Sequence, residues 1–302
     1  MKNIAIAFSA KHVYSLPDGH RFPIAKYSLV YEQLLYEGVI AEDQVKDVGL
    51  LAEEVLLLTH SNEYWQKLKN QTLSEKETRK IGLPIHQQSL QRSLNTSQGT
   101  IFASEQALNN GLGLNLAGGT HHAYAGHGEG FCIFNDIAIA ANCLLSRNLA
   151  QKVIVIDLDV HQGNGTAAIF QQDSRVFTFS MHGKNNYPHK KERSDLDIEL
   201  PKGTDDNEYL HILSENLPRL ISKIKPDLIY YQAGVDVLAT DLLGTLALSK
   251  NGCKQRDEIV IENCCRLDIP LVIVMGGGYS PRLADIVDAH CNTYKTALDI
   301  YH

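Results

Sequence analysis

The fold is decided by the stretch KVIVIDLDVHQGNG, residues 152–165. Residues 153–156 form an apolar, β-branched run, which is typical of a buried strand. Two carboxylates and an imidazole follow at alternate positions, Asp157, Asp159 and His161, before glycines allow the chain to turn away. Such a strand predicts a parallel sheet, in which ligands collect where the strands end.

Runs of the same kind alternate with amphipathic stretches along the rest of the chain. Strands are predicted at 152–157, 175–180, 227–232 and 270–275, and helices at 135–147, 206–225 and 252–267. A short apolar run at 4–8 predicts a buried first strand, since it is shorter than the core of a signal peptide. The polar segment 72–96 has no steady period, so we expect a surface excursion there.

The chain shows no internal repeat, low-complexity tract or flexible linker that would divide it. We therefore expect one domain over residues 1–302. Its fold class is α/β: a three-layer α/β/α arrangement with a central, mostly parallel sheet.

Composition excludes several classes of protein. Hydrophobic residues make up 44% and charged residues 21% of the 302, as in ordinary folded chains. No apolar run approaches the ~20 residues of a membrane span. A net charge of −7 argues against nucleic-acid binding. The six cysteines form no C-x-x-C pair, which predicts a reducing, cytoplasmic location.

The predicted strand ends carry candidate metal ligands. Asp236 follows the strand at 227–232 as Asp159 and His161 follow the strand at 152–157. Together these three side chains supply three protein ligands and leave one position open, the pattern of a catalytic site. Carboxylate and imidazole suit Zn(II), Fe(II) and Mn(II), with zinc as the default. An isolated D-x-D-x-H can equally be a hydrogen-bonded loop, and the second acid is what favours a metal site.

Other strand ends carry groups suited to catalysis. His121 and His122 end the run GGTHH and can act as a general base and an electrostatic partner, although adjacent histidines are often surface residues. Tyr279 follows three glycines and can donate a hydrogen bond to an oxyanion. Phe131, in the run GEGFC, fits either a pocket wall or the core.

Taken together, these segments resemble the histone deacetylase family of the arginase/deacetylase superfamily. The segments in the family's order and spacing are 118–122, 130–132, 135–136, 157–161, 163–165, 232–236, 241–244 and 276–279. The small size, the DVHQGNG variant and the short segment around Tyr187-Pro188 look like the class IV histone deacetylases and the bacterial histone deacetylase-like amidohydrolases.

The resemblance implies the arginase/deacetylase fold and a metal-dependent amidohydrolase. Such an enzyme removes acyl groups from Nε-acyl-lysine by metal-activated water, as a deacetylase or a long-chain deacylase. Its partner is then an acyl-lysine protein or peptide, and the alternative is an acylated amine such as an acylpolyamine. The implied cofactors are Zn(II), or Fe(II) instead, and a structural K⁺ or Na⁺ ion.

Individual roles are also carried over by the resemblance. The metal ligands are Asp159, His161 and Asp236. The catalytic group comprises His121, His122 and Tyr279, with Asp157 and Asn164 behind the two histidines. The substrate tunnel is lined by Gly130, Phe131 and Tyr187, and the structural cation lies at Asp157 and Ser180.

Asn164 departs from the common pattern, in which an aspartate pairs with the second histidine. A neutral partner leaves His122 less basic, because the imidazolium lacks a stabilising negative charge. The N-terminal quarter matches loosely, with Pro23, Lys26 and His60 at comparable places.

The sequence disfavours two rival functions. A ureohydrolase such as arginase needs further carboxylates for a second manganese, and this chain has Gly163 and Leu238 at those positions. A non-catalytic acyl-lysine reader would be free to lose ligands, histidines or the tyrosine, and all are present. The sequence leaves acyl length and oligomeric state open.

Overall fold

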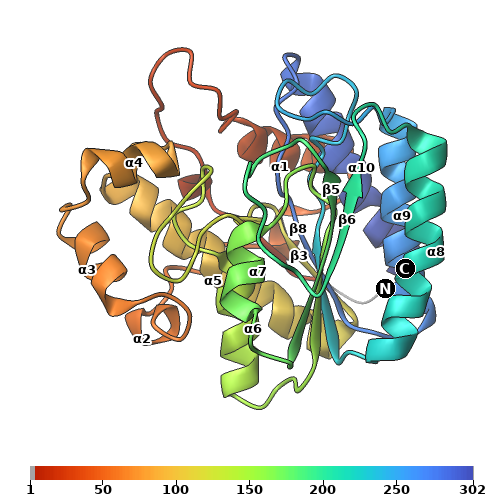
Figure 1. Ribbon diagram of the computed structural model, residues 1–302, viewed down its shortest axis with the longest axis horizontal. Helices are drawn as coiled ribbons and strands as arrows, with labels where there is room; N and C mark the ends of the chain where they lie inside the picture. Colours follow the sequence, from red (N-terminus) through yellow and green to blue (C-terminus); the bar gives the residue numbers. More distant parts are fainter. Residues whose placement is uncertain (1–3, 302) are drawn as a thin grey trace.

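An eight-stranded sheet runs through the centre of the protein in the computed structural model, which describes residues 4–301 (Figure 1). The strands follow the order β2-β1-β3-β8-β7-β4-β5-β6, and each adjacent pair is parallel. Their bounds are β1 Ile6–Ala7, β2 Val45–Lys46, β3 Leu112–Asn115, β4 Val153–Asp157, β5 Val176–Gly183, β6 Leu196–Leu200, β7 Leu228–Gln232 and β8 Leu271–Val274.

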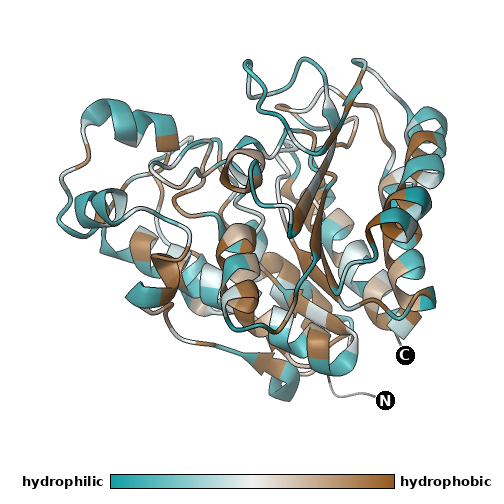
Figure 2. Cartoon of the chain, turned by 60° about the horizontal axis from the view of Figure 1, so that its bottom comes forward, coloured by the Kyte–Doolittle hydropathy of each residue, from teal (hydrophilic) through white to brown (hydrophobic). Residues whose placement is uncertain are grey.

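Helices cover both faces of this sheet and give three layers. Helices α1, α8, α9 and α10 pack along one face, and α5, α6 and α7 cover the other (Figure 1). Their bounds, with those of the short α2, α3 and α4 beside α5, are α1 Lys26–Tyr36, α2 Glu53–Leu56, α3 Asn62–Lys69, α4 Glu75–Ile81, α5 Gln87–Asn110, α6 Asp136–Ser146, α7 Asn164–Phe170, α8 Asp206–Ile224, α9 Lys250–Arg266 and α10 Leu283–Tyr301. Figure 2 shows apolar residues on the strands and on the helix faces turned toward them.

The predicted fold class is confirmed. Each strand and helix predicted from the pattern is present within a few residues, and β1 lies within the predicted first strand. The sheet is wholly rather than mostly parallel. The predicted domain span of 1–302 stays a prediction, because residues 1–3 and 302 lie outside the described part. None of the described helices is long and apolar enough to cross a membrane.

The prediction of a surface excursion over 72–96 holds for the first part of the segment and was wrong for residues 89–96, which are mostly buried. This segment holds α4 and the first part of α5, whose inward face is polar but buried. Several of the buried polar groups have partners: Arg92 Nε donates to His12 O at 3.0 Å, and Asn95 Nδ2 donates to Asp47 Oδ1 at 2.8 Å. Hydrogen-bonded polar side chains replace the apolar stripe that a periodicity search looks for.

Candidate active site

The candidate residues meet at the carboxyl edge of four adjacent strands, β3, β8, β7 and β4. The loops that leave these strands carry, in that order, 118–122, 276–279, 233–236 and 158–164. Parallel strands end at the same edge, so residues up to 161 positions apart in the chain become neighbours.

Asp159, His161 and Asp236 form a buried cluster. One ligand atom from each lies within 4.8 Å of the others. His161 Nδ1 lies 3.0 Å from Asp159 Oδ1 and 3.1 Å from Asp236 Oδ2. Burial and the Asp159 charge raise the pKa of Asp236 to about 7. Two buried carboxylates that resist joint ionisation, together with an imidazole nitrogen, are a donor set that fits a divalent cation.

Backbone groups and a buried arginine fix the loops that carry this cluster. Gly277 N donates to Asp159 Oδ2 at 2.8 Å, and a Cβ on that glycine would lie 1.9 Å from Asp236 Oδ2, so only glycine fits. Arg256, fully buried on α9, donates to the carbonyl oxygens of Leu158 at 3.2 Å and Gly234 at 2.5 Å. One guanidinium therefore joins two ligand loops that are far apart in sequence.

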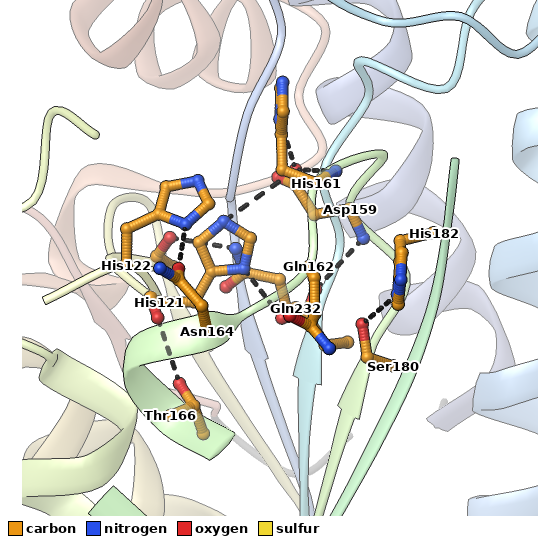
Figure 3. Close-up of polar contacts among 12 residues, drawn as sticks. His121, His122, Asp159, His161, Gln162, Asn164, Thr166, Ser180, His182 and Gln232 are labelled. Carbon is orange, nitrogen blue, oxygen red and sulfur yellow. Dashed lines mark hydrogen bonds and ion pairs between the residues drawn. The ribbon is translucent and has the colours of Figure 1, made fainter. Parts of the chain in front are cut away.

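The two adjacent histidines have different partners (Figure 3). His121 Nδ1 donates to Asp157 Oδ2 at 2.7 Å, whereas His122 Nδ1 donates to Asn164 Oδ1 at 2.6 Å. Although burial opposes it, the charges of Asp157 and Asp159 raise the pKa of His121 to about 9. Burial, with the nearby positive charge of His121, holds the pKa of His122 well below its usual value. In the protein without a metal ion, these shifts make His121 the cation and His122 the neutral ring at neutral pH.

A cavity of about 400 Å³ opens above these groups. Its wall includes His122, His161 and Tyr279 together with the three residues predicted for the tunnel, Gly130, Phe131 and Tyr187. The end of α4 supplies Arg79, Lys80, Ile81 and Gly82 to the same wall. Part of the segment 72–96, whose role the sequence left open, thus borders the cavity.

Backbone pairing joins α4 to the tunnel loop. Gly130 N donates to Lys80 O at 3.1 Å, and Phe131 N donates to Ile81 O at 2.7 Å. Gly130 has a φ of +54°, and a Cβ there would lie 2.6 Å from His122 Cδ2. The loop can thus pass directly over the second histidine only with glycine at this position.

Tyr279 faces the same cavity. Its backbone N donates to Asp241 Oδ2 at 2.6 Å, and its ring centroid lies 6.2 Å from that of His161. Burial and the charges of Asp159 and Asp236 raise the pKa of Tyr279 well above its usual value. The phenol therefore stays protonated and able to donate a hydrogen bond.

Asp157 and Ser180 are register partners on β4 and β5, so their side chains lie on the same face of the sheet. Ser180 Oγ also lies 2.8 Å from His182 Nδ1 (Figure 3). A cation at this pair stays a prediction.

Comparison with known proteins identifies the chain. Residues 20–294 match the model of the histone deacetylase domain. The chain belongs to the histone deacetylase family. It is therefore a hydrolase of that family, as the sequence resemblance predicted.

Relatives and a solved structure agree with this assignment. The chain is 45% identical to an uncharacterized protein of Picosynechococcus sp. over 98% of its own length and 99% of that protein. It is 30% identical to histone deacetylase 2 of Arabidopsis thaliana, covering 95% of this chain and 77% of the relative. The acetoin utilization protein AcuC of Staphylococcus aureus is 31% identical over 76% of this chain and 64% of that protein. The HD domain of HDA15 has the same fold, with a TM-score of 0.81 at 20% identity over 98% of this chain and 88% of that one.

Sequence reasoning missed several residues around this family's site. Lys26, noted only as comparable, is fully buried and donates to Gly276 O at 2.7 Å, behind Tyr279. Arg256 gave no signal, because a charged residue in an amphipathic stretch is usually exposed. Glu129 belongs to the run GEGFC, but nothing in the sequence indicates its contact with Asn164.

Proposed function

We propose that this histone deacetylase-family hydrolase is a metal-dependent amidohydrolase that removes acyl groups from Nε-acyl-lysine of a protein or peptide. One observation carries the proposal. The cavity that reaches the Asp159, His161 and Asp236 cluster is also lined by His122 and Tyr279. A metal site, a base and an oxyanion donor thus border one space, which is what amide hydrolysis by an activated water requires.

Zinc is the metal we propose, with Fe(II) as the alternative, held by Asp159, His161 and Asp236. When bound, such an ion polarises the acyl carbonyl and lowers the pKa of water. Among residues 4–301, no second group of three potential ligand side chains meets the same distance limit. This supports a single metal and disfavours a two-manganese ureohydrolase.

The protein's own groups divide the proton chemistry. His122 is neutral, and its Nδ1 hydrogen is bound to Asn164, so its Nε2 lone pair accepts a proton from the attacking water. Tyr279 donates its phenolic hydrogen bond to the oxygen that becomes negative as water adds to the carbonyl carbon. When the C–N bond breaks, His122 returns the proton to the leaving amine nitrogen. His121, positively charged and bound to Asp157, stabilises the negative charge that develops beside it as water adds to the carbonyl carbon.

The walls and mouth of the cavity favour an acyl-lysine peptide. Phe131 and Tyr187 provide aromatic surface for the aliphatic part of a lysine side chain. The mouth carries Arg21, Arg79 and Lys80, and none of the residues that line the cavity has a carboxylate. Lys80 pairs with Glu129 at 2.5 Å and Arg79 with Glu75 at 3.5 Å, whereas Arg21 forms no ion pair within residues 4–301. The Arg21 charge disfavours a polycationic acylpolyamine and favours acidic residues beside the modified lysine.

Other finer assignments are part of the same proposal. The class IV type and a K⁺ or Na⁺ ion at Asp157 and Ser180 rest on the sequence resemblance, and a cytoplasmic location rests on the cysteine pattern. Asp157 would then both orient His121 and neutralise the ion.

Steady-state kinetics on acetyl-, octanoyl- and myristoyl-lysine peptides, with zinc or iron supplied, tests the proposal. We expect turnover of at least one peptide, and a ~100- to 1000-fold lower kcat in Tyr279→Phe, which keeps the cavity but lacks one oxyanion donor. Binding of acyl-lysine peptides with no turnover in the parent would instead indicate a reader. Near-parental kcat in Tyr279→Phe would show that this tyrosine only packs beside the glycine turn.

A further inference from the structure

A buried carboxylate lies behind Asn164, one step farther from His122 than a direct aspartate partner would be. Glu129 is 5% exposed, and Asn164 Nδ2 donates to its Oε1 at 3.1 Å. The order of contacts is therefore His122, Asn164, Glu129. An amide thus separates the carboxylate from the histidine.

Glu129 can only accept hydrogen bonds at neutral pH. Burial opposes its charge, but hydrogen bonds from His127, Lys80 and Tyr187 lower the pKa of Glu129 to about 2. Lys80 Nζ lies 2.5 Å from Oε2, and the Tyr187 hydroxyl donates to Oε1. An ionised carboxylate offers no hydrogen, so whatever Asn164 presents to it must be a donor.

Tyr124 imposes the same orientation from a second direction. Its hydroxyl donates to Glu192 Oε1 at 3.1 Å, so its oxygen is left to accept from Asn164 Nδ2 at 3.0 Å. Two neighbours thus require the NH₂ group of Asn164 to face outward. The amide oxygen must then face His122, 2.6 Å from Nδ1.

We infer that Glu129 is a positioning residue for hydrolysis: it fixes the Asn164 amide and thereby the His122 tautomer that carries hydrogen on Nδ1 and a free lone pair on Nε2. The inference rests on the proposed function for the role of that lone pair, and on the contacts alone for the tautomer. With the amide reversed, its NH₂ would face Nδ1, and the hydrogen would move to Nε2, where the ring could no longer accept a proton from water.

Moving the carboxylate provides a test. Glu129→Gln lets either end of the new amide face Asn164, which leaves Tyr124 alone to orient the Asn164 amide, while a hydrogen bond to Tyr187 can persist. Asn164→Asp alone places a second carboxylate against Glu129, which raises the proton affinity of the pair. The double variant Glu129→Gln/Asn164→Asp again has one carboxylate, now directly on His122, and the amide introduced at position 129 can donate to it.

We expect kcat to fall ~10- to 100-fold in Glu129→Gln, the usual cost of losing an outer partner, with a smaller change in KM. The double variant should recover most of that kcat, whereas Asn164→Asp alone should not match the parent. Tyr187→Phe, which removes only the tunnel contact to Glu129, should raise KM more than it lowers kcat. Parental kcat in Glu129→Gln, or a double variant slower than both single variants, would overturn the role.

Nitrogen-15 NMR of the His122 ring in the metal-free protein tests the tautomer independently of turnover. The parent should show hydrogen on Nδ1, and Glu129→Gln should shift the ring toward the Nε2–H form. Identical Nδ1–H spectra in both would overturn the inference. A parent without turnover but with this spectral difference would overturn the proposed function while leaving the positioning of His122 supported.

Discussion

The surroundings of His121 and His122 differ although the residues are adjacent and their rings lie 4.1 Å apart. His121 meets its carboxylate directly, at the end of the central strand β4. His122 meets an amide, and the nearest carboxylate beyond it belongs to a loop bordered by α4 and the cavity mouth. Two rings so close cannot easily both be charged, and the directly placed carboxylate decides which one holds the proton. Partner chemistry, not residue type, therefore separates the histidine proposed as the electrostatic group from the one proposed as the base.

Removing a proposed metal ligand should abolish activity, whatever the state of His121 and His122. Asp159→Ala, His161→Ala and Asp236→Ala should each lose bound metal, measured by elemental analysis, and activity by well over ~100-fold, since each removes a bond and the geometry of the site. Asp241→Asn, which changes a nearby carboxylate outside the cluster, should keep its metal. Stoichiometric metal in Asp236→Ala would contradict the ligand assignment.

Asp157→Asn gives His121 an amide partner, so that its surroundings resemble those of His122. We expect kcat to fall ~10- to 100-fold. In the metal-free variant, the pKa of His121 should lie below the value of about 9 in the parent, because a neighbouring negative charge is lost. An NMR titration of the ring measures this shift. Asp173→Asn, at an exposed Arg175 pair, is the control for one lost charge. An unchanged His121 pKa would mean that Asp157 does not hold the proton there.

Charge at the cavity mouth, on the His122 side of the site, should affect which peptides are bound. Arg21→Glu should lower kcat/KM for a peptide with acidic residues beside the acyl-lysine by up to ~5-fold, as expected for one exposed charge interaction. The same peptide should lose its advantage over a basic one as salt is added. Lys76→Glu changes net charge equally but lies outside the cavity lining. Equal effects of the two variants would argue against local recognition at the rim.

A further expected effect, on stability and not on catalysis, concerns His60, which supports the loop of the histidine pair. His60 Nε2 accepts from Asn135 N at 3.0 Å, and Asn135 Nδ2 donates to Ala123 O at 3.2 Å. Burial lowers the pKa of His60 from 6.5 to about 4. The unfolded chain therefore binds more protons, so this contribution to stability is complete above about pH 6.5 and is lost as the pH falls toward 4.

Urea unfolding at pH 7.5 and pH 5 measures this contribution. The parent should lose about 2 kcal/mol more than His60→Gln between these pH values. Equal losses in the two proteins would show that His60 is not neutral in the folded state, or that another group dominates acid unfolding.

The central strands and the site residues at their carboxyl ends could be predicted from the sequence for the same physical reason. A strand such as β4 is buried on both faces and reads as a continuous apolar run, and parallel strands bring their ends to one edge. Asp159, His161 and Asp236 were therefore accessible to reasoning from the residues. The segment 72–96 was not, because its helices bury hydrogen-bonded polar groups. Neither was the contact of Glu129 with Asn164, which depends on the path of a loop over His122 that no local pattern specifies.

The position of β8 constrains how the protein is made. This strand lies between β3 and β7, yet it comes near the end of the chain, and the glycine loop that completes the metal cluster follows it. During synthesis, the edges of β3 and β7 that pair with β8 therefore stay unpaired until residues beyond 270 have left the ribosome. Unpaired parallel edges are prone to wrong association. Synthesis interrupted before β8 thus leaves a chain in which the histidine pair and the proposed metal ligands are translated but the site is not assembled.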